Sequence, residues 1–286
     1  MKHKAELAIH QYMSDAANGK SSISEDTIKQ IGQDVMDAMQ RQFGGGNKRE
    51  EFKLRMSNIG RPTCQLWYDK HQPEKALPRP TTFVMNMMLG DIVEAVFKGI
   101  LKEAGVKYED SEQVSLDLGE DNINGTYDLV IDGAVDDVKS ASDWSYRNKF
   151  SSCEDLASGD SFGYIAQLVG YAKAAKKKLG GWWVVNKATG DFKYVPASAV
   201  NEQDELDKIK KTVDTVNNNV CKRCFEPVED GKSGNMKLGV NCSYCDFKWE
   251  CWPGLRLFLY RDKPRYLTHV EREPKDTIPE VKHNAV

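Results

Sequence analysis

The chain of 286 residues lacks several features that would place it in a special class of protein. It has no apolar run near the length of a membrane span, so we expect no membrane partner. Its first residues, MKHKAELAIHQYM, contain no signal-peptide core, so a cytoplasmic location is expected. It also has no excess of basic residues. Because the formal net charge is −3, any nucleic-acid site is expected to be a local patch rather than the whole surface.

What is present is the composition of a folded globular chain. Hydrophobic residues make up 40% and charged residues 29% of the sequence, and the length allows a full core. The first 46 residues predict a helical extension that covers the core or binds a protein partner. Its second helix has Ser24 as a candidate N-cap, and the run Gly44-Gly45-Gly46 marks its end. One face of that helix is apolar: Ile28, Ile31, Val35, Met36 and Met39.

Residues 125–140, read GTYDLVIDGAVDDVKS, predict a β-hairpin with strands at 126–131 and 134–139. The Asp132-Gly133 pair between them is typical of a two-residue turn whose central positions have positive φ. In that register Ile131 faces Ala134, Val130 faces Val135 and Leu129 faces Asp136. Asp128 then faces Asp137, with side-chain roots about 5 Å apart, and Lys139 shares their face. Directly opposed like charges destabilise a hairpin, so the pair indicates a bound cation.

Two helices carry further candidate site residues. Residues 82–104 predict a largely buried helix on which Glu94 lies among apolar residues, one turn after Gly90. A buried carboxylate is either a metal ligand or paired with a lysine, and we favour the metal. Residues 161–178 predict another helix, on which Gln167 and Tyr171 share a face.

Basic residues near these helices are candidate DNA contacts. The helix that ends near residue 178 closes with Lys173, Lys176 and Lys177, which either compensate the helix dipole or contact phosphates. Arg147 and Lys149 lie in a polar segment with aromatic residues. That mixture suits single-stranded nucleic acid but is also typical of ordinary surface loops.

Cysteine is abundant for a reducing compartment, and five of the seven cysteines lie between Cys221 and Cys251. Metal binding explains them better than disulfides. One arrangement is a zinc site that uses two C-x2-C pairs, Cys221, Cys224, Cys242 and Cys245. The other is a [4Fe–4S] cluster held by Cys64, Cys242, Cys245 and Cys251. Spacing alone favours zinc.

Taken in order, these motifs resemble the RecB-like branch of the PD-(D/E)xK nuclease superfamily, over about residues 57–252. The resembling motifs are Gly90-x3-Glu94, Gly125-x2-Asp128, Asp137-Val138-Lys139 and Gln167-x3-Tyr171. The family often has histidine where this chain has Glu94, a hard-metal ligand of equal suitability. The chain has no helicase P-loop, so it does not resemble a complete helicase–nuclease.

The cysteines resemble those of the iron–sulfur members of this branch, the AddB and CRISPR-adaptation types. These have one cysteine before the core and C-x2-C-x5-C after it, which Cys64, Cys242, Cys245 and Cys251 match. The resemblance therefore reverses the preference and implies the cluster rather than zinc, although Cys221 and Cys224 depart from the pattern.

The resemblance also implies an α/β fold with a restriction-endonuclease-like core, in which a central mixed sheet is flanked by helices. Glu94, Asp128, Asp137 and the Val138 carbonyl would hold Mg²⁺ or Mn²⁺. Lys139 would position water or steady the phosphate, and Gln167 and Tyr171 would orient Lys139 or the DNA. The expected domains are a helical extension (1–46), a nuclease core (47–220), a Cys-rich segment that packs back through Cys64 (221–270) and a flexible tail (271–286).

The expected function is that of a metal-dependent deoxyribonuclease, with an exonuclease favoured, acting in DNA recombination, repair or degradation. Its partner would be DNA with a free end or a single-stranded part. The alternatives are a non-catalytic DNA-binding adaptor with a zinc-ribbon-like C-terminus, or a structural protein with a nuclease-like fold. The retained set of Asp128, Asp137 and Lys139 favours the enzyme.

Overall fold

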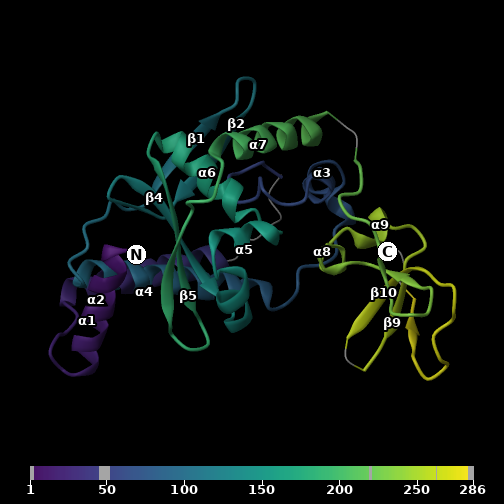
Figure 1. The fold of residues 1–286 in the computed structure, drawn as a ribbon, viewed down its shortest axis with the longest axis horizontal. Coiled ribbons are helices and arrows are strands. Elements are labelled where there is room, and N and C mark those ends of the chain that lie inside the picture. The colour runs from purple at the N-terminus through teal and green to yellow at the C-terminus, as the bar shows by residue number, and fades with distance from the viewer. Residues whose placement is uncertain (1–2, 45–51, 219–220, 262, 283–286) are drawn as a thin grey trace. The chain divides into compact units, whose positions relative to one another are not determined.

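The computed structural model describes residues 3–44, 52–218, 221–261 and 263–282. The chain is of the α/β class and divides into two compact units (Figure 1). Unit 1 comprises Met1–Gly60 and Pro80–Val213, and unit 2 comprises Arg61–Arg79 and Asp214–Val286. Of the predicted boundary at Gly44-Gly45-Gly46, the last two glycines lie outside the described residues.

Unit 1 is built on a mixed four-stranded sheet with the order β3-β4-β5-β6. Strands β3 (Leu129–Ile131) and β4 (Ala134–Ala141) are antiparallel, and β4 runs parallel to β5 (Lys178–Asn186). Strand β6 (Phe192–Pro196) returns antiparallel to β5. A separate antiparallel pair joins β1 (Glu112–Asp117) to β2 (Asn122–Tyr127). The parallel β4–β5 step requires a crossover, which contains α6 (Tyr164–Ala175).

The predicted hairpin register is confirmed at three of its four pairs, Leu129 with Asp136, Val130 with Val135 and Ile131 with Ala134, whereas Asp128 is not paired with Asp137. Asp132 and Gly133 have φ of 51° and 77°, as the turn requires. The prediction of one strand over 126–131 is wrong, because the chain leaves the β1–β2 pair after Tyr127 and joins β4 from Leu129. Asp128 therefore lies at the break between two strands, and its side chain is free to turn toward β4.

Helices pack on both faces of the sheet, and an apolar cluster fills the space on each face. Trp182 and Val184 belong to a cluster with α6, α5 (Cys153–Ser158) and α7 (Glu202–Asn217). Trp183 lies in a second cluster with α4 (Phe83–Glu103) and α1 (Lys4–Ala17). Alternation along a strand places successive residues on opposite sheet faces, so β5 is buried on both.

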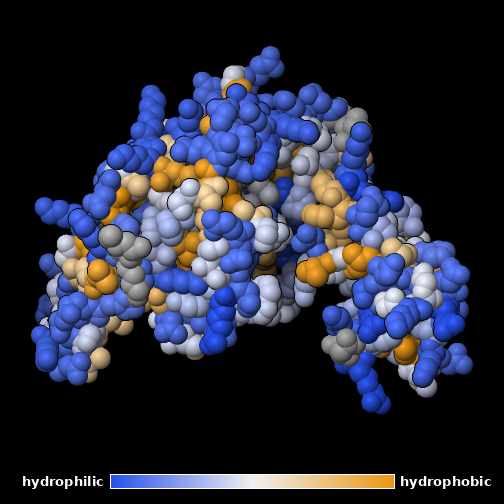
Figure 2. All heavy atoms as spheres, in the orientation of Figure 1, coloured by the Kyte–Doolittle hydropathy of each residue, from blue (hydrophilic) through white to orange (hydrophobic). Residues whose placement is uncertain are grey.

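The two predicted N-terminal helices are confirmed as α1 and α2 (Glu25–Phe43), and Ser24 accepts the Thr27 backbone N–H as N-cap. The expected apolar face of α2 packs only in part: Ile31 and Val35 are half-buried, and a Cβ on Gly99 of α4 would lie 2.5 Å from Ile31 Cδ1. Thr27 and Ala38 are buried, whereas Ile28, Met36 and Met39 are exposed. Hydrophilic residues dominate the face of the molecule in Figure 2, with hydrophobic ones scattered between them. Among the described helices, none is both long and apolar enough to cross a membrane.

Unit 2 combines short helices with a five-stranded antiparallel sheet of the order β11-β9-β10-β8-β7. Its helices are α3 (Thr63–His71), a 3-10 turn (Pro73–Lys75), α8 (Val240–Ser243) and α9 (Lys248–Cys251). Its strands are β7 (Val228–Glu229), β8 (Met236–Lys237), β9 (Arg256–Leu259), β10 (Pro264–His269) and β11 (Glu280–Val281).

The C-terminal segment differs from the flexible tail expected over 271–286. Strand β11 pairs with β9 through Glu280–Phe258 and Val281–Leu257. Arg256 on β9 also forms ion pairs with Glu273 at 2.7 Å and Glu280 at 2.8 Å. These contacts hold residues 273–281 on β9, although their charge and proline content predicted a loose tail. Residues 283–286 lie outside the described part.

Candidate active site

Two carboxyl groups, those of Asp128 and Asp137, lie close together beside the middle of β4, although the two residues are not paired as strand partners. Asp128 Oδ2 accepts the Val138 backbone N–H at 2.7 Å, so the Asp128 carboxyl lies next to the residue that follows Asp137. Asp137 is buried, and Asp128 keeps some exposed surface although its carboxyl lies deep. Burial, followed by the charge of Asp137, raises the pKa of Asp128 well above its usual range. Burial also raises the pKa of Asp137. The pair is thus arranged to share a proton or a cation.

Lys139 supplies a positive charge next to the two carboxyls. Its Nζ lies 2.7 Å from Asp137 Oδ1 and 2.6 Å from Oδ2. Burial lowers the pKa of Lys139, but the charges of Asp137 and Asp128 outweigh burial and raise it overall. The side chain therefore remains an ammonium, suited to donating hydrogen bonds to an anion and unsuited to acting as a base.

Gln167 and Tyr171 extend this arrangement from α6. Lys139 Nζ lies 3.4 Å from Gln167 Oε1, and Gln167 Nε2 donates to the Tyr171 hydroxyl at 3.1 Å. Burial raises the pKa of Tyr171 to about 12, so its hydroxyl stays protonated. A Cβ on Gly125 would lie 2.6 Å from the Tyr171 ring, so the glycine makes room for this ring. The sequence motifs around residues 125, 137 and 167 converge on one place.

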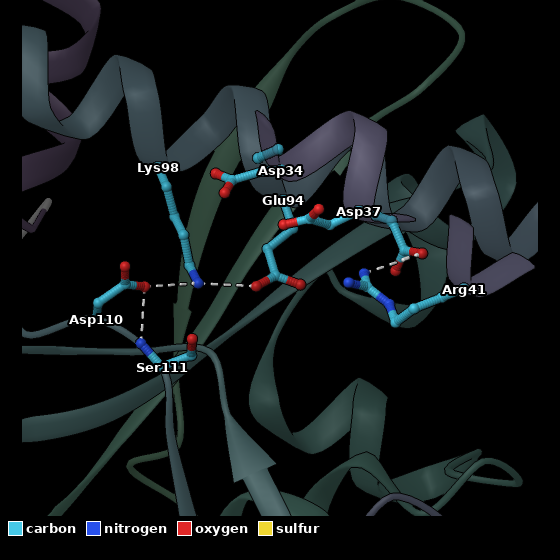
Figure 3. A pocket seen from close by; sticks show the side chains of 9 residues that line it. Asp34, Asp37, Arg41, Glu94, Lys98, Asp110 and Ser111 are labelled. Carbon is cyan, nitrogen blue, oxygen red and sulfur yellow. Dashed lines mark hydrogen bonds and ion pairs between the residues drawn. The ribbon is translucent and has the colours of Figure 1, made fainter. Parts of the chain in front are cut away.

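Glu94 forms the lysine ion pair that the sequence offered as the alternative to a metal. Its Oε1 lies 2.9 Å from Lys98 Nζ, which also contacts Asp110 Oδ1 at 3.0 Å (Figure 3). Its charge still reaches the hairpin, where it raises the pKa of both Asp128 and Asp137 after the effect of burial. Gly90, one turn earlier, is not required by close packing, because a Cβ there would make only an ordinary contact with the Ser140 hydroxyl, at 3.9 Å.

A polar pocket of about 190 Å³ opens beside Glu94 between α2 and α4. Arg41 from α2 lies 3.5 Å from Asp91 on α4. These α2 residues were not predicted from the sequence, because nothing in their spacing links them to Glu94. The pocket is lined by Asp34, Asp37, Arg41, Asp91, Glu94, Ala95, Lys98, Asp110 and Ser111 (Figure 3).

The basic residues that the sequence proposed as DNA contacts differ in their surroundings. Lys177 is paired with Glu109 at 2.9 Å, and Arg147 with Asp143 at 2.9 Å. Lys173 lies in the last turn of α6 and Lys176 caps it, which fits dipole compensation. Lys149 instead lies over the rings of Phe162 and Tyr164, and Tyr164 also contacts Lys139. Tyr164 was missed by sequence reasoning, although it precedes Gln167 by one helical turn.

The fit of a divalent cation can be tested on the hairpin carboxyls. Asp137 Oδ2 is buried and makes no hydrogen bond of acceptable geometry, although the Lys139 ammonium is close. Such an oxygen, next to a second buried carboxyl, is a suitable hard-metal donor. Within the described ranges, no three His, Cys, Asp or Glu side chains are directed at a common metal position. In this conformation Glu94 and Asp137 are turned toward lysines.

All cysteines except Cys153 belong to unit 2, with Cys64 included among them. The Cys64 backbone N–H donates to Cys224 Sγ at 3.1 Å. A hydrogen bond from the Cys64 thiol lowers the pKa of Cys224 to about 6 and raises that of Cys64. The nearby Cys251 also contributes to the raised pKa of four other thiols, those of Cys64, Cys221, Cys242 and Cys245. The closest pair, Cys64 and Cys224, joins one member of each predicted ligand set, so this geometry does not separate the cluster from zinc.

Comparisons with known proteins add little to this geometry. No protein-family model and no curated protein matches the sequence. A solved structure titled "Crystal structure of SSO0001" is 14% identical, with a TM-score of 0.43. The similarity covers 80% of this chain and 98% of that one. A likeness this weak supports no conclusion about fold family or function.

Proposed function

We propose that the protein is a divalent-metal-dependent DNA nuclease with a PD-(D/E)xK core of the RecB-like type. One observation supports the proposal most: Asp128, Asp137 and Lys139 meet beside the middle of β4, with Gln167 from α6 within reach of the lysine. Buried carboxyls with raised pKa next to a charged lysine are typical of functional sites. A core built only for stability would gain from apolar residues there.

Asp128, Asp137, Glu94 and the Val138 carbonyl are the groups that would hold Mg²⁺ or Mn²⁺. The bound ion would lower the pKa of a water molecule and stabilise charge on the scissile phosphate. Glu94 is available because its partner Lys98 also contacts Asp110 and keeps that ion pair if Glu94 turns away.

The chain's own residues would bind and orient the phosphate. Lys139, held as an ammonium, donates hydrogen bonds to a phosphate oxygen or to the attacking water. Gln167 fixes the position of Lys139 through Oε1, and Tyr171 in turn fixes the Gln167 amide. With pKa values raised in Lys139 and Tyr171, neither side chain serves as the base at neutral pH.

The cysteines of unit 2 are proposed to hold a structural [4Fe–4S] cluster through Cys64, Cys242, Cys245 and Cys251. A zinc site at Cys221, Cys224, Cys242 and Cys245 is the alternative. The cluster would link α3, through Cys64, to a segment more than 150 residues later in the chain, as the Cys64–Cys224 contact already does over 160 residues. Closing so long a loop restricts the unfolded chain and stabilises the fold.

The biological role proposed is exonuclease action in DNA recombination, repair or degradation in a cytoplasm. The exposed Met36, Met39 and Phe43 on α2 are compatible with a protein partner at the N-terminal helices. The second candidate is a non-catalytic DNA-binding adaptor with a zinc-ribbon-like C-terminus, which the two C-x2-C pairs at Cys221 and Cys242 support.

Digestion of end-labelled DNA separates these functions. Linear and circular duplexes are incubated with the purified protein in Mg²⁺, in Mn²⁺ and in chelator. The nuclease proposal expects cleavage only with metal, and an exonuclease degrades only the linear form. DNA binding without cleavage in either metal favours the adaptor.

A further inference from the structure

Two lysines and two aromatic rings form a continuous row that begins at the candidate active site. Lys139 Nζ lies 5.0 Å from the centroid of the Tyr164 ring. Lys149 Nζ lies 5.0 Å from the same ring and 4.7 Å from the ring of Phe162. The two rings stack, with centroids 5.6 Å apart and an interplanar angle of 14°. Phe162 ends the row at the surface, with 58% of its area exposed.

The backbone that carries the rings is held in place before any ligand binds. The Asp160 carboxylate accepts the backbone N–H groups of Gly163, Tyr164 and Ile165 at 2.9 to 3.0 Å. Gly163 has φ of 78°, and a Cβ on Gly60 would overlap its backbone, so the two glycines allow close packing there. A preorganised platform loses little conformational entropy on binding.

The π-helix Ser145–Lys149 brings the second cation to this platform. Its last residue, Lys149, lies against both rings, and Phe150, which follows it, stacks on Tyr164 at 5.7 Å. Phe150 is buried, whereas Phe162 is exposed. A single exposed phenylalanine needs no explanation. A flat exposed ring that is stacked on a second ring and flanked by an ammonium is the arrangement that proteins use to bind single-stranded nucleic acid.

We propose that Phe162 is a stacking site for a nucleobase in the single-stranded end of a DNA substrate. Lys149 neutralises the phosphate next to that base, and Tyr164 connects the site to Lys139. The inference rests on the proposed nuclease function, because it names the part of the substrate that this same site takes. It also selects, among the predicted basic contacts, Lys149 over Arg147 and Lys177, which are paired with carboxylates.

Binding of two matched oligonucleotides to the full-length protein tests the site. Each is a labelled duplex with a single-stranded overhang, composed of thymidines in one and of abasic residues in the other. Affinity is measured by fluorescence anisotropy in Ca²⁺. For Phe162→Ala we expect affinity for the thymidine overhang to fall about five- to 150-fold, with no loss for the abasic overhang. Phe162→Trp should retain the wild-type affinity for both.

Phe43→Ala is the matched control, because Phe43 has a similar exposure of 56% and lies on α2, away from this row. Equal weakening of both overhangs by Phe162→Ala, or no weakening of either, would overturn the stacking site. Cleavage in Mg²⁺ is recorded in parallel. Base-dependent binding without cleavage refutes the nuclease function alone, and cleavage without base-dependent binding refutes the stacking site alone. If the wild type neither binds either oligonucleotide nor cleaves them, both proposals are refuted.

Discussion

Lys139 Nζ lies 2.6 Å from Asp137 Oδ2, and the two residues are two positions apart on the same strand. This ion pair is almost fully enclosed, with 18% and 2% of the two side chains exposed. Burial of the Lys139 ammonium and the neighbouring carboxyls is favourable only while each buried charge has an opposite charge beside it. The pair is therefore a sensitive point for stability as well as for chemistry.

Loss of Lys139 should destabilise the fold. In Lys139→Met the carboxyls of Asp128 and Asp137 lose their buried counter-charge, so we expect the free energy of unfolding in urea to fall by about 3–5 kcal/mol at neutral pH. Lys177→Met removes a more exposed ion pair with Glu109 and should change the free energy of unfolding by less than about 1 kcal/mol. Similar losses in the two variants would contradict a buried charge balance.

Gly125→Ala should disturb the position of Tyr171. The added methyl group would lie 2.6 Å from the Tyr171 ring and 2.9 Å from Met56 Cβ. Overpacking of this kind costs about 1–3 kcal/mol, and displacement of Tyr171 from Gln167 should lower DNA cleavage as well. Gly32→Ala, at an open position on α2, is the control and should be neutral or stabilising. Equal behaviour of both variants in thermal unfolding would show that the close approach at Gly125 is unimportant.

Asp136 should make stability depend on pH. Burial raises its pKa to about 7, although Tyr194, Gly181 and Trp183 all donate hydrogen bonds to its carboxyl. With the folded pKa above the unfolded one, the folded state binds the extra proton, so this contribution is complete below about pH 4 and disappears as pH rises through 7. From about pH 5 to pH 8 we expect a loss of about 2–3 kcal/mol.

Asp136→Asn isolates that contribution, because the amide does not titrate. Urea unfolding of both proteins across this range should show a pH-dependent loss in the wild type that is absent from the variant. The difference between the two proteins is the relevant quantity, since other groups titrate in both. A constant difference at every pH would place the folded pKa of Asp136 near its ordinary value.

The cysteine ligands can be assigned by metal analysis of alanine variants. For a [4Fe–4S] cluster, Cys251→Ala should lose iron and visible absorption, whereas the double variant Cys221→Ala/Cys224→Ala should keep both. For zinc, the double variant loses the metal and Cys251→Ala keeps it. Cys153→Ala is the control, because Cys153 is buried in unit 1 apart from the other cysteines. Iron loss in the double variant would refute the proposed ligand set.

The sequence predicted the hairpin well because its information is local. The Asp132-Gly133 turn fixes the register, and the register places Asp136 and Asp137 on opposite faces of β4. The break at Asp128 was not predictable, since it depends on the pairing of β2 with β1, a contact outside the hairpin. The packing of α2 was predicted only in part: Ile31 and Val35 are half-buried, whereas the rest of the apolar face is exposed and Thr27 and Ala38 are buried instead.

The candidate site, too, was predicted only in part from the sequence. Spacing predicted that Lys139 would accompany Asp137 and that Gln167 and Tyr171 would share a face, and the hydrogen bonds agree. The sequence favoured a metal for Glu94, although the lysine ion pair that forms, with Lys98 one turn later on α4, was the alternative it offered. It did not predict that Tyr164 contacts Lys139, because that contact depends on how α6 meets β4.

The most direct test of the nuclease proposal is metal-dependent cleavage of end-labelled linear DNA by the wild type and by Asp137→Asn. The substitution keeps the size of the side chain and removes the charge that would hold the cation. We predict cleavage by the wild type in Mg²⁺ or Mn²⁺ and a loss of at least about a hundredfold in the variant, with its fold and cysteine-bound metal retained. Near-normal cleavage by the variant, or none by the metal-loaded wild type, would contradict the proposed active site.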